Sequence, residues 1–200
     1  AEFSPNSKTI LTLSNTNRDD KNNKVILWSS ATGNALTEIK NKKKINKVGY
    51  SNDSQRVLTA ADDTTLRVTN MSDGTSIHLK HDLPIRGAEF SQDGSLIVTS
   101  SDDGIVRLWS SSTAQMKGSA DLGVTTNNSL QFSADDQWIL AISFDNKVKV
   151  FSSQDLVLKY TFPSEEQIST FDEISKAEFS PDGRVVLAST NYNRQIETWS

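Results

Sequence analysis

The stretch AEFSPDGRVVLAS at residues 177–189 is nearly repeated at the start of the chain, where residues 1–13 read AEFSPNSKTILTL. Three related segments lie between them: VGYSNDSQRVLTA at 48–60, AEFSQDGSLIVTS at 88–100 and LQFSADDQWILAI at 130–142. Their aromatic anchors are 47, 40, 42 and 47 residues apart, at Phe3, Tyr50, Phe90, Phe132 and Phe179. Such a period indicates an array of similar units. We place the five units at about 1–40, 41–80, 81–121, 122–162 and 163–200.

Each unit begins with a segment of alternating polarity, such as IRGAEFS at 85–91, which predicts a β-strand. A turn follows at once, and two units supply Asp and Gly for it, at 91–94 and 180–183. Glycine suits this turn because it tolerates positive φ. The other three units carry Ser7, Ser54 and Asp136 at the glycine position. We therefore expect them to keep the turn geometry at some local cost.

The rest of each unit also has the character of short strands. Runs such as SLIVTSS at 95–101 are apolar on consecutive residues, as expected of strands covered on both faces. Third segments lie at 24–29, 65–70, 105–110, 147–152 and 195–200, and weaker fourth segments at 34–40, 75–80 and 156–162. Four antiparallel strands repeated about every forty residues predict an all-β fold of five four-stranded propeller blades.

At these positions the chain resembles the WD-repeat (WD40) family of β-propellers along essentially its whole length. The family ends its third strand in Trp-Asp, with an Asp six residues before the Trp and a His nine residues before the first-strand aromatic. The Trp position holds Trp28, Thr69, Trp109, Phe151 and Trp199. The Asp position holds Asn22, Asp63, Asp103, Asp145 and Asn193, and the His position of units two to five holds Asn41, His81, Gly123 and Thr170.

The third unit alone combines all three family residues, as His81, Asp103 and Trp109. The resemblance implies that they form the family's buried hydrogen-bonded tetrad, completed by Thr99 or Ser101. Such a network satisfies polar groups between strands, since an unpartnered buried donor costs about 1–3 kcal/mol. We expect the other units to manage with partial networks.

Composition narrows the classes of function. The formal charge is −4 and the pI is near 5.2, which gives no general attraction to nucleic acid or to an anionic membrane. The chain has no cysteine, which fits a cytoplasmic or nuclear setting and excludes a disulfide framework. No apolar run approaches the ~20 residues that span a bilayer.

Catalytic and metal-binding patterns are weak. There is no cysteine nucleophile and no G-x-S-x-G elbow, and only His78 and His81 supply imidazole. These two histidines have no fixed common face and no third ligand near them in sequence, so we predict no metal site and no cofactor. Paired acids mostly fall in turns that the repeat explains. We therefore expect the protein not to be an enzyme.

The sharpest charged segment is KNKKKINK at 40–47, which lies between two units. Lys43 and Lys44, together with Lys42, could receive phosphate or an acidic segment of a partner. A solvated loop explains the same residues, because the whole chain is acidic and no aromatic residue interleaves for base stacking.

Partner contacts in the family often come from the residue before the Asp position and from a residue early in the inner strand. Carried over by position, the first set is Lys21, Asp62, Asp102, Phe144 and Tyr192, and the second is Asn46, Arg86, Asn128 and Ser175. Phe144 and Tyr192 rank first, because aromatic side chains in exposed turns have little packing role and aromatic residues dominate interface energetics. Arg86 follows them.

The resemblance thus implies a non-catalytic scaffold or sensor module that binds other proteins or peptides through the top face of the propeller. Two alternatives stay open. One is an enzyme or small-ligand binder that uses the central channel, and the other is phosphate or nucleic-acid binding through Lys40–Lys47. Because neither end of the chain supplies an outer strand for the fifth unit, we expect the chain to continue beyond both ends as part of a larger, seven-bladed propeller.

Overall fold

The computed structural model describes residues 1–15, 23–123, 130–162, 174–190 and 196–199. Every regular element within these ranges is a β-strand, and strands that follow one another in sequence pair antiparallel within separate sheets. The predicted all-β class is therefore confirmed.

We call the five sheets blades 1 to 5. Blade 1 contains β1 (Glu2–Phe3), β2 (Thr9–Ser14), β3 (Asn23–Ser29) and β4 (Ala35–Asn41). Blade 2 contains β5 (Ile45–Tyr50), β6 (Arg56–Ala61), β7 (Thr65–Asn70) and β8 (Ser76–Lys80). Blade 3 contains β9 (Ile85–Phe90), β10 (Leu96–Ser101), β11 (Ile105–Ser110) and β12 (Met116–Asp121). Blade 4 contains β13 (Leu130–Phe132), β14 (Trp138–Ile142), β15 (Val148–Ser152) and β16 (Leu158–Phe162), and blade 5 contains β17 (Ile174–Phe179), β18 (Val186–Thr190) and β19 (Ile196–Trp199).

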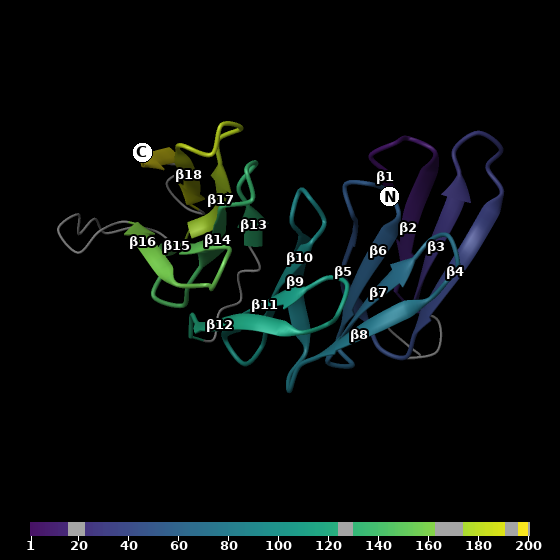
Figure 1. The fold of residues 1–200 in the computed structure, drawn as a ribbon, viewed down its shortest axis with the longest axis horizontal. Helices are drawn as coiled ribbons and strands as arrows, with labels where there is room; N and C mark the ends of the chain where they lie inside the picture. Colours follow the sequence, from purple (N-terminus) through teal and green to yellow (C-terminus); the bar gives the residue numbers. More distant parts are fainter. Residues whose placement is uncertain (16–22, 124–129, 163–173, 191–195, 200) are drawn as a thin grey trace.

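The blades follow one another along an open arc, with blade 1 and blade 5 at opposite ends (Figure 1). Blade 3 meets blades 2 and 4 through their first strands, since β9 contacts both β5 and β13, and blade 5 meets blade 4 through β17 and β14. We call the first strand of each blade its inner strand. That this arc belongs to a seven-bladed ring stays a prediction.

The hydrophobic core is divided into clusters that each lie between two consecutive blades. The cluster between blades 2 and 3, for example, joins Leu58 and Leu66 to Ile85, Ile97 and Trp109. Three similar clusters join blade 1 to blade 2, blade 3 to blade 4 and blade 4 to blade 5. Burial of apolar surface contributes about 25 cal/mol per Å², so each blade depends on its neighbours for most of its hydrophobic stabilisation.

The first turn of every blade is fixed by a serine hydroxyl. The serine donates to the side chain two residues later, in the pairs Ser4–Asn6, Ser51–Asp53, Ser91–Asp93, Ser133–Asp135 and Ser180–Asp182. This bond is the largest cause that lowers the pKa of the four aspartates below its usual value. The repeated Ser-x-Asp pattern therefore has a local purpose.

The glycine position of these turns is left-handed in all five blades. Gly94 and Gly183 have φ of 69° and 70°, and Ser7, Ser54 and Asp136 have φ of 58°, 60° and 58°. The expectation that the non-glycine residues keep the geometry is confirmed. A left-handed backbone costs an L-residue roughly 1–2 kcal/mol.

Two of these strained residues contact the preceding blade. Ser54 Oγ accepts a hydrogen bond from the backbone N–H of Asn6 at 3.1 Å. The Asp136 carboxylate accepts from the backbone N–H groups of Gln92 and Asp93 at 2.6 and 2.8 Å. These bonds between blades offset part of the backbone cost.

Candidate partner-binding face

A repeated backbone hydrogen bond defines one face of the arc. In blades 2, 3 and 4, the residue before the Asp position donates its N–H to the connection that precedes the blade: Asp62 to Lys44 O at 2.9 Å, Asp102 to Pro84 O at 3.0 Å and Phe144 to Leu122 O at 3.0 Å. We call this the upper face, and the face with the Ser-x-Asp turns the lower face. Asp62, Asp102 and Phe144 therefore hold equivalent places in blades 2, 3 and 4.

Four of the predicted contact residues form one polar network on the upper face. Arg86 donates from Nε and NH2 to the two carboxylate oxygens of Asp102, at 2.7 and 2.5 Å. Its NH1 donates to Asp62 Oδ1 at 2.7 Å, and Asn46 Nδ2 donates to the same oxygen at 2.8 Å. The network thus joins the upper turns of blades 2 and 3.

Phe144 differs from its equivalents. Its side chain is 73% exposed, whereas Asp62 and Asp102 are engaged by Arg86. Its backbone is nevertheless held in place, because the Phe144 N–H donates to Leu122 O. An apolar ring therefore stands in water on a fixed piece of backbone.

The remaining predicted contact residues fall into two groups. Lys43 and Lys44 are exposed in the connection between blades 1 and 2. Asn128, Tyr192 and Lys21 lie outside the described residues.

In blade 3 the structure brings three of the four predicted tetrad residues into direct contact. Trp109 Nε1 donates to Thr99 Oγ1 at 2.9 Å, and His81 Nε2 lies 3.0 Å from the same hydroxyl. All three side chains are buried. Burial, and then the positive charge of Arg107, lower the pKa of His81 to about 4.

Asp103 reaches this group through Arg107, which the sequence reasoning did not include. Arg107 NH1 donates to His81 Nδ1 at 3.1 Å, and NH2 donates to Asp103 Oδ2 at 2.7 Å. Since Nδ1 accepts, Nε2 of the neutral imidazole carries the proton and donates to Thr99. Burial opposes ionisation of Asp103, but bonds from Arg107 and Ser101 outweigh it and keep its pKa below the usual value.

A second group that the sequence reasoning missed is Glu89, which is partly buried on the inner strand β9 of blade 3. Burial raises the pKa of Glu89 to about 7, and Lys47 and a hydrogen bond with the backbone of Phe132 act in the opposite direction. Alternation puts Glu89 on the opposite face of the strand from Ala88 and Phe90. The available signal for its burial was that strands of this kind are covered on both faces.

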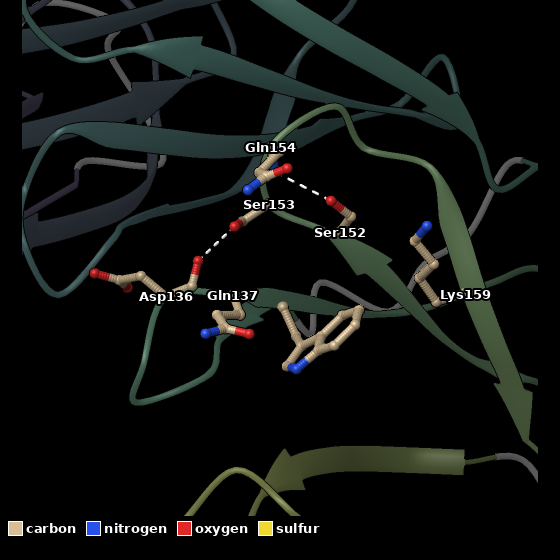
Figure 2. Close-up of a pocket in the computed structure, with 7 residues that line it drawn as sticks. Asp136, Gln137, Ser152, Ser153, Gln154 and Lys159 are labelled. Carbon is tan, nitrogen blue, oxygen red and sulfur yellow. Dashed lines mark hydrogen bonds between the residues drawn. The ribbon is translucent and has the colours of Figure 1, made fainter.

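The lower face of blade 4 contains a polar pocket of about 410 Å³ (Figure 2). Its lining residues are Asp136, Gln137, Trp138, Ser152, Ser153, Gln154 and Lys159. Ser153 Oγ donates to the backbone oxygen of Asp136, and Gln154 N–H donates to Ser152 Oγ at 3.2 Å (Figure 2). These hydroxyl groups stabilise the two turns of the blade, so we assign the pocket no chemistry.

In the part of the chain that the structure describes, no three histidine or carboxylate side chains are grouped to hold a metal ion. No helix in that part is long and apolar enough to cross a membrane.

Two curated relatives each match more than half of this chain. The DENN domain and WD repeat-containing protein SCD1 of Arabidopsis thaliana is 25% identical over 128 residues, covering 62% of this chain and 11% of that protein. The serine-threonine kinase receptor-associated protein of Gallus gallus is 26% identical over 168 residues, covering 81% of this chain and 45% of that protein. The chain therefore spans less than half the length of either relative.

The family comparison matches more than half of the chain. Residues 33–70, 74–110 and 113–152 match the WD40 family, described as WD domain, G-beta repeat. Each match ends at the close of the third strand of blades 2, 3 and 4. Repeats of this kind indicate, in general, a scaffold for protein interaction. With the four-stranded blades and the blade 3 network, these matches show that the chain belongs to the WD40 repeat family.

Proposed function

We propose that this chain binds partner proteins through its upper face without catalysing a reaction, and that Phe144 is the apolar anchor. The observation that carries the proposal is the exposure of Phe144, 73%, at a position where blades 2 and 3 hold engaged carboxylates. Exposed aromatic residues surrounded by polar groups are typical of the energetic centres of protein interfaces.

The turn that carries Phe144 is fixed before any partner binds. Its N–H donates to Leu122 O, and the neighbouring Ser143 hydroxyl donates to Asp145 Oδ1 and lies 3.1 Å from Lys147 O. A fixed anchor loses little conformational entropy on binding, which favours affinity. The side chains of Arg86, Asp102, Asp62 and Asn46 supply a rigid polar surface on the two preceding blades.

The alternative of a ligand site in the central channel has less support. It needs inner-strand polar groups that are free to meet a ligand, and Asn46 and Arg86 are both engaged with carboxylates. We therefore keep protein binding as the proposed function. In this proposal the position of Phe144, and not a reactive group, determines binding.

Affinity capture with the full-length protein tests this proposal. We expect Phe144→Ala to reduce recovery of bound partners at least about tenfold, as truncation of an interface hot spot does, with an unchanged melting temperature. The matched control is Val157→Ala, because Val157 is also an exposed apolar residue, 48% exposed, but lies at the lower turn before β16. Equal recovery by wild type and Phe144→Ala would remove the proposed anchor.

A further inference from the structure

A cleft of about 730 Å³ opens between blades 1 and 2. Its lining residues are Lys40, Asn41, Lys42, Asp63, Thr65, Arg67 and His78. Three of these side chains are cationic and one is a carboxylate, so the cleft is positive although the chain as a whole is acidic.

Arg67 is the central cation of this cleft, and its surroundings differ from those of its equivalent in the next blade. Arg67 pairs with Thr59 on β6, as Arg107 pairs with Thr99 on β10. Arg107 is engaged by His81 and by Asp103. Arg67 donates from NH1 to the backbone oxygen of Lys40 at 3.1 Å, and it forms no ion pair within the described ranges.

A substitution at the His position accounts for the imidazole contact that Arg67 lacks, whereas Asp63 holds the same place in blade 2 as Asp103 does in blade 3. Asn41 stands in blade 2 where His81 stands in blade 3, and the shorter amide side chain is buried, 7% exposed. Asn41 Oδ1 and Thr59 Oγ1 have no hydrogen-bond partner among the described residues. The cleft therefore combines a guanidinium that forms no ion pair within the described ranges with a buried acceptor that has no donor there.

Acidic groups nearby do not neutralise the cleft. Glu38 Oε1 lies 3.6 Å from Lys40 Nζ, but its other oxygen binds Lys24 Nζ at 3.2 Å. Within the cleft, Asp63 Oδ1 accepts the backbone N–H of Thr65 at 3.2 Å. These two carboxylates, one shared with Lys24 and the other bound to a backbone N–H, therefore do not balance the three cations of the cleft.

We propose that this cleft binds a phosphate monoester. The planar guanidinium of Arg67 can donate two parallel hydrogen bonds to phosphate oxygens, and Lys40 and Lys42 add charge from the adjoining connection. Thr65 and His78, the latter cross-strand from Arg67, complete a polar wall.

Nucleic acid is a poorer occupant for the same cleft. Base recognition in single strands needs aromatic side chains on which bases stack, and the only ring among the lining residues is the His78 imidazole. The formal charge of −4 also opposes a long polyanion. The site is distinct from the Phe144 surface, which belongs to blade 4.

Calorimetric titration of the full-length protein with phenyl phosphate at constant ionic strength tests the proposal. We expect Arg67→Gln to weaken binding about tenfold or more, as loss of a charged hydrogen-bond pair does. Lys117→Ala is the matched control and should bind as wild type does, because Lys117 is an exposed cation of β12 outside the cleft. Equal affinity of wild type and Arg67→Gln, or no binding by wild type, would overturn the proposal.

A second variant separates binding from folding. Asn41→His places an imidazole where blade 3 has one, so it should engage both Thr59 and Arg67 as His81 engages Thr99 and Arg107. We expect this variant to melt at a higher temperature than wild type and to bind phenyl phosphate more weakly. A stabilised variant with undiminished binding would contradict the role of Arg67.

The source of the phosphate is decided by a peptide arm. A degenerate phosphoserine peptide pool and the same pool after dephosphorylation are each passed over the immobilised full-length protein. Retention of the phosphorylated pool alone supports the site and assigns it to a modified partner. Phenyl phosphate binding without peptide retention supports the site and assigns it to a small phosphate compound.

Discussion

The guanidinium of Arg86 holds both carboxylate oxygens of Asp102, with Nε 2.7 Å from Oδ1 and NH2 2.5 Å from Oδ2. The remaining nitrogen, NH1, donates to Asp62 at 2.7 Å. One side chain of blade 3 therefore fixes upper turns of two blades, and its planar geometry makes Lys a poor replacement.

We expect Arg86→Gln to lower the free energy of unfolding by roughly 1 kcal/mol, because it leaves two carboxylates together without their cation. The cost is modest because all three side chains are about one third exposed, with exposed fractions of 31%, 30% and 35%. Urea unfolding at low ionic strength measures the change. In a double-mutant cycle, Asp102→Asn should cost less in the Arg86→Gln background than in wild type; equal costs would mean that the pair does not interact.

Glycine substitutions at two equivalent left-handed positions should change the free energy of unfolding in opposite directions. Ser7→Gly should raise the free energy of unfolding by roughly 0.5 kcal/mol, since glycine removes the backbone strain at φ 58° but adds chain entropy to the unfolded state. Asp136→Gly should lower it by roughly 1 kcal/mol, because the loss of two bonds to Gln92 and Asp93 outweighs the same relief. Thermal unfolding of both variants measures the signs.

The control for Asp136 is Asp136→Asn, which keeps one acceptor oxygen and a residue that tolerates positive φ. We expect it to lie between wild type and Asp136→Gly in stability. If Asp136→Gly were the more stable protein, the contact between blades 3 and 4 would carry no free energy.

Two titratable groups of blade 3, Glu89 and His81, should make the free energy of unfolding depend on pH in opposite directions. Glu89 ionises near 4.5 when unfolded and about 7 when folded, so its contribution is present at low pH and is lost as the pH rises through 7. His81 ionises near 6.5 when unfolded and about 4 when folded, so its contribution is complete above 6.5 and is lost as the pH falls to 4. Each of these two pKa shifts contributes about 3 kcal/mol to the free energy of unfolding when it acts in full.

The two contributions oppose each other between pH 4.5 and 6.5, so wild type should have a nearly flat stability profile there. Glu89→Gln removes one of them. Urea unfolding from pH 4.5 to 7 should then show a free energy of unfolding that rises by about 2–3 kcal/mol, as His81 of the unfolded chain loses its proton. A profile for Glu89→Gln as flat as that of wild type would show that these two groups do not set the dependence.

The repeat alone was enough to predict the class of fold and most strands. Period, turn chemistry and apolar runs are local properties, and they were sufficient to identify the left-handed turns at Ser7, Ser54 and Asp136. The strand β12, Met116–Asp121, was missed because MKGSAD has neither alternation nor β-branched residues. It forms because β11 offers it an edge to pair with, and a pairing partner is not a local property.

The sequence predicted which positions belong to the candidate site, but it did not predict which of these residues contact one another. Asp62, Asp102, Arg86 and Asn46 were identified singly, but their union in one network depends on how two blades are set beside each other. Arg107 escaped notice because the family pattern contains no basic residue at that place. The positive cleft required the same kind of information, since its cations come from two blades and the connection between them.

The bonds that Ser54 and Asp136 make to the blades before them have a consequence for protein engineering. Units with similar sequences invite the exchange, duplication or reordering of modules, yet the second and fourth units carry side chains that bind the unit before them. An array with reordered units would keep the strand pairing within each unit and lose these hydrogen bonds between units. Transplanted segments of this protein should therefore contain pairs of adjacent units, so that the bonds between them are kept.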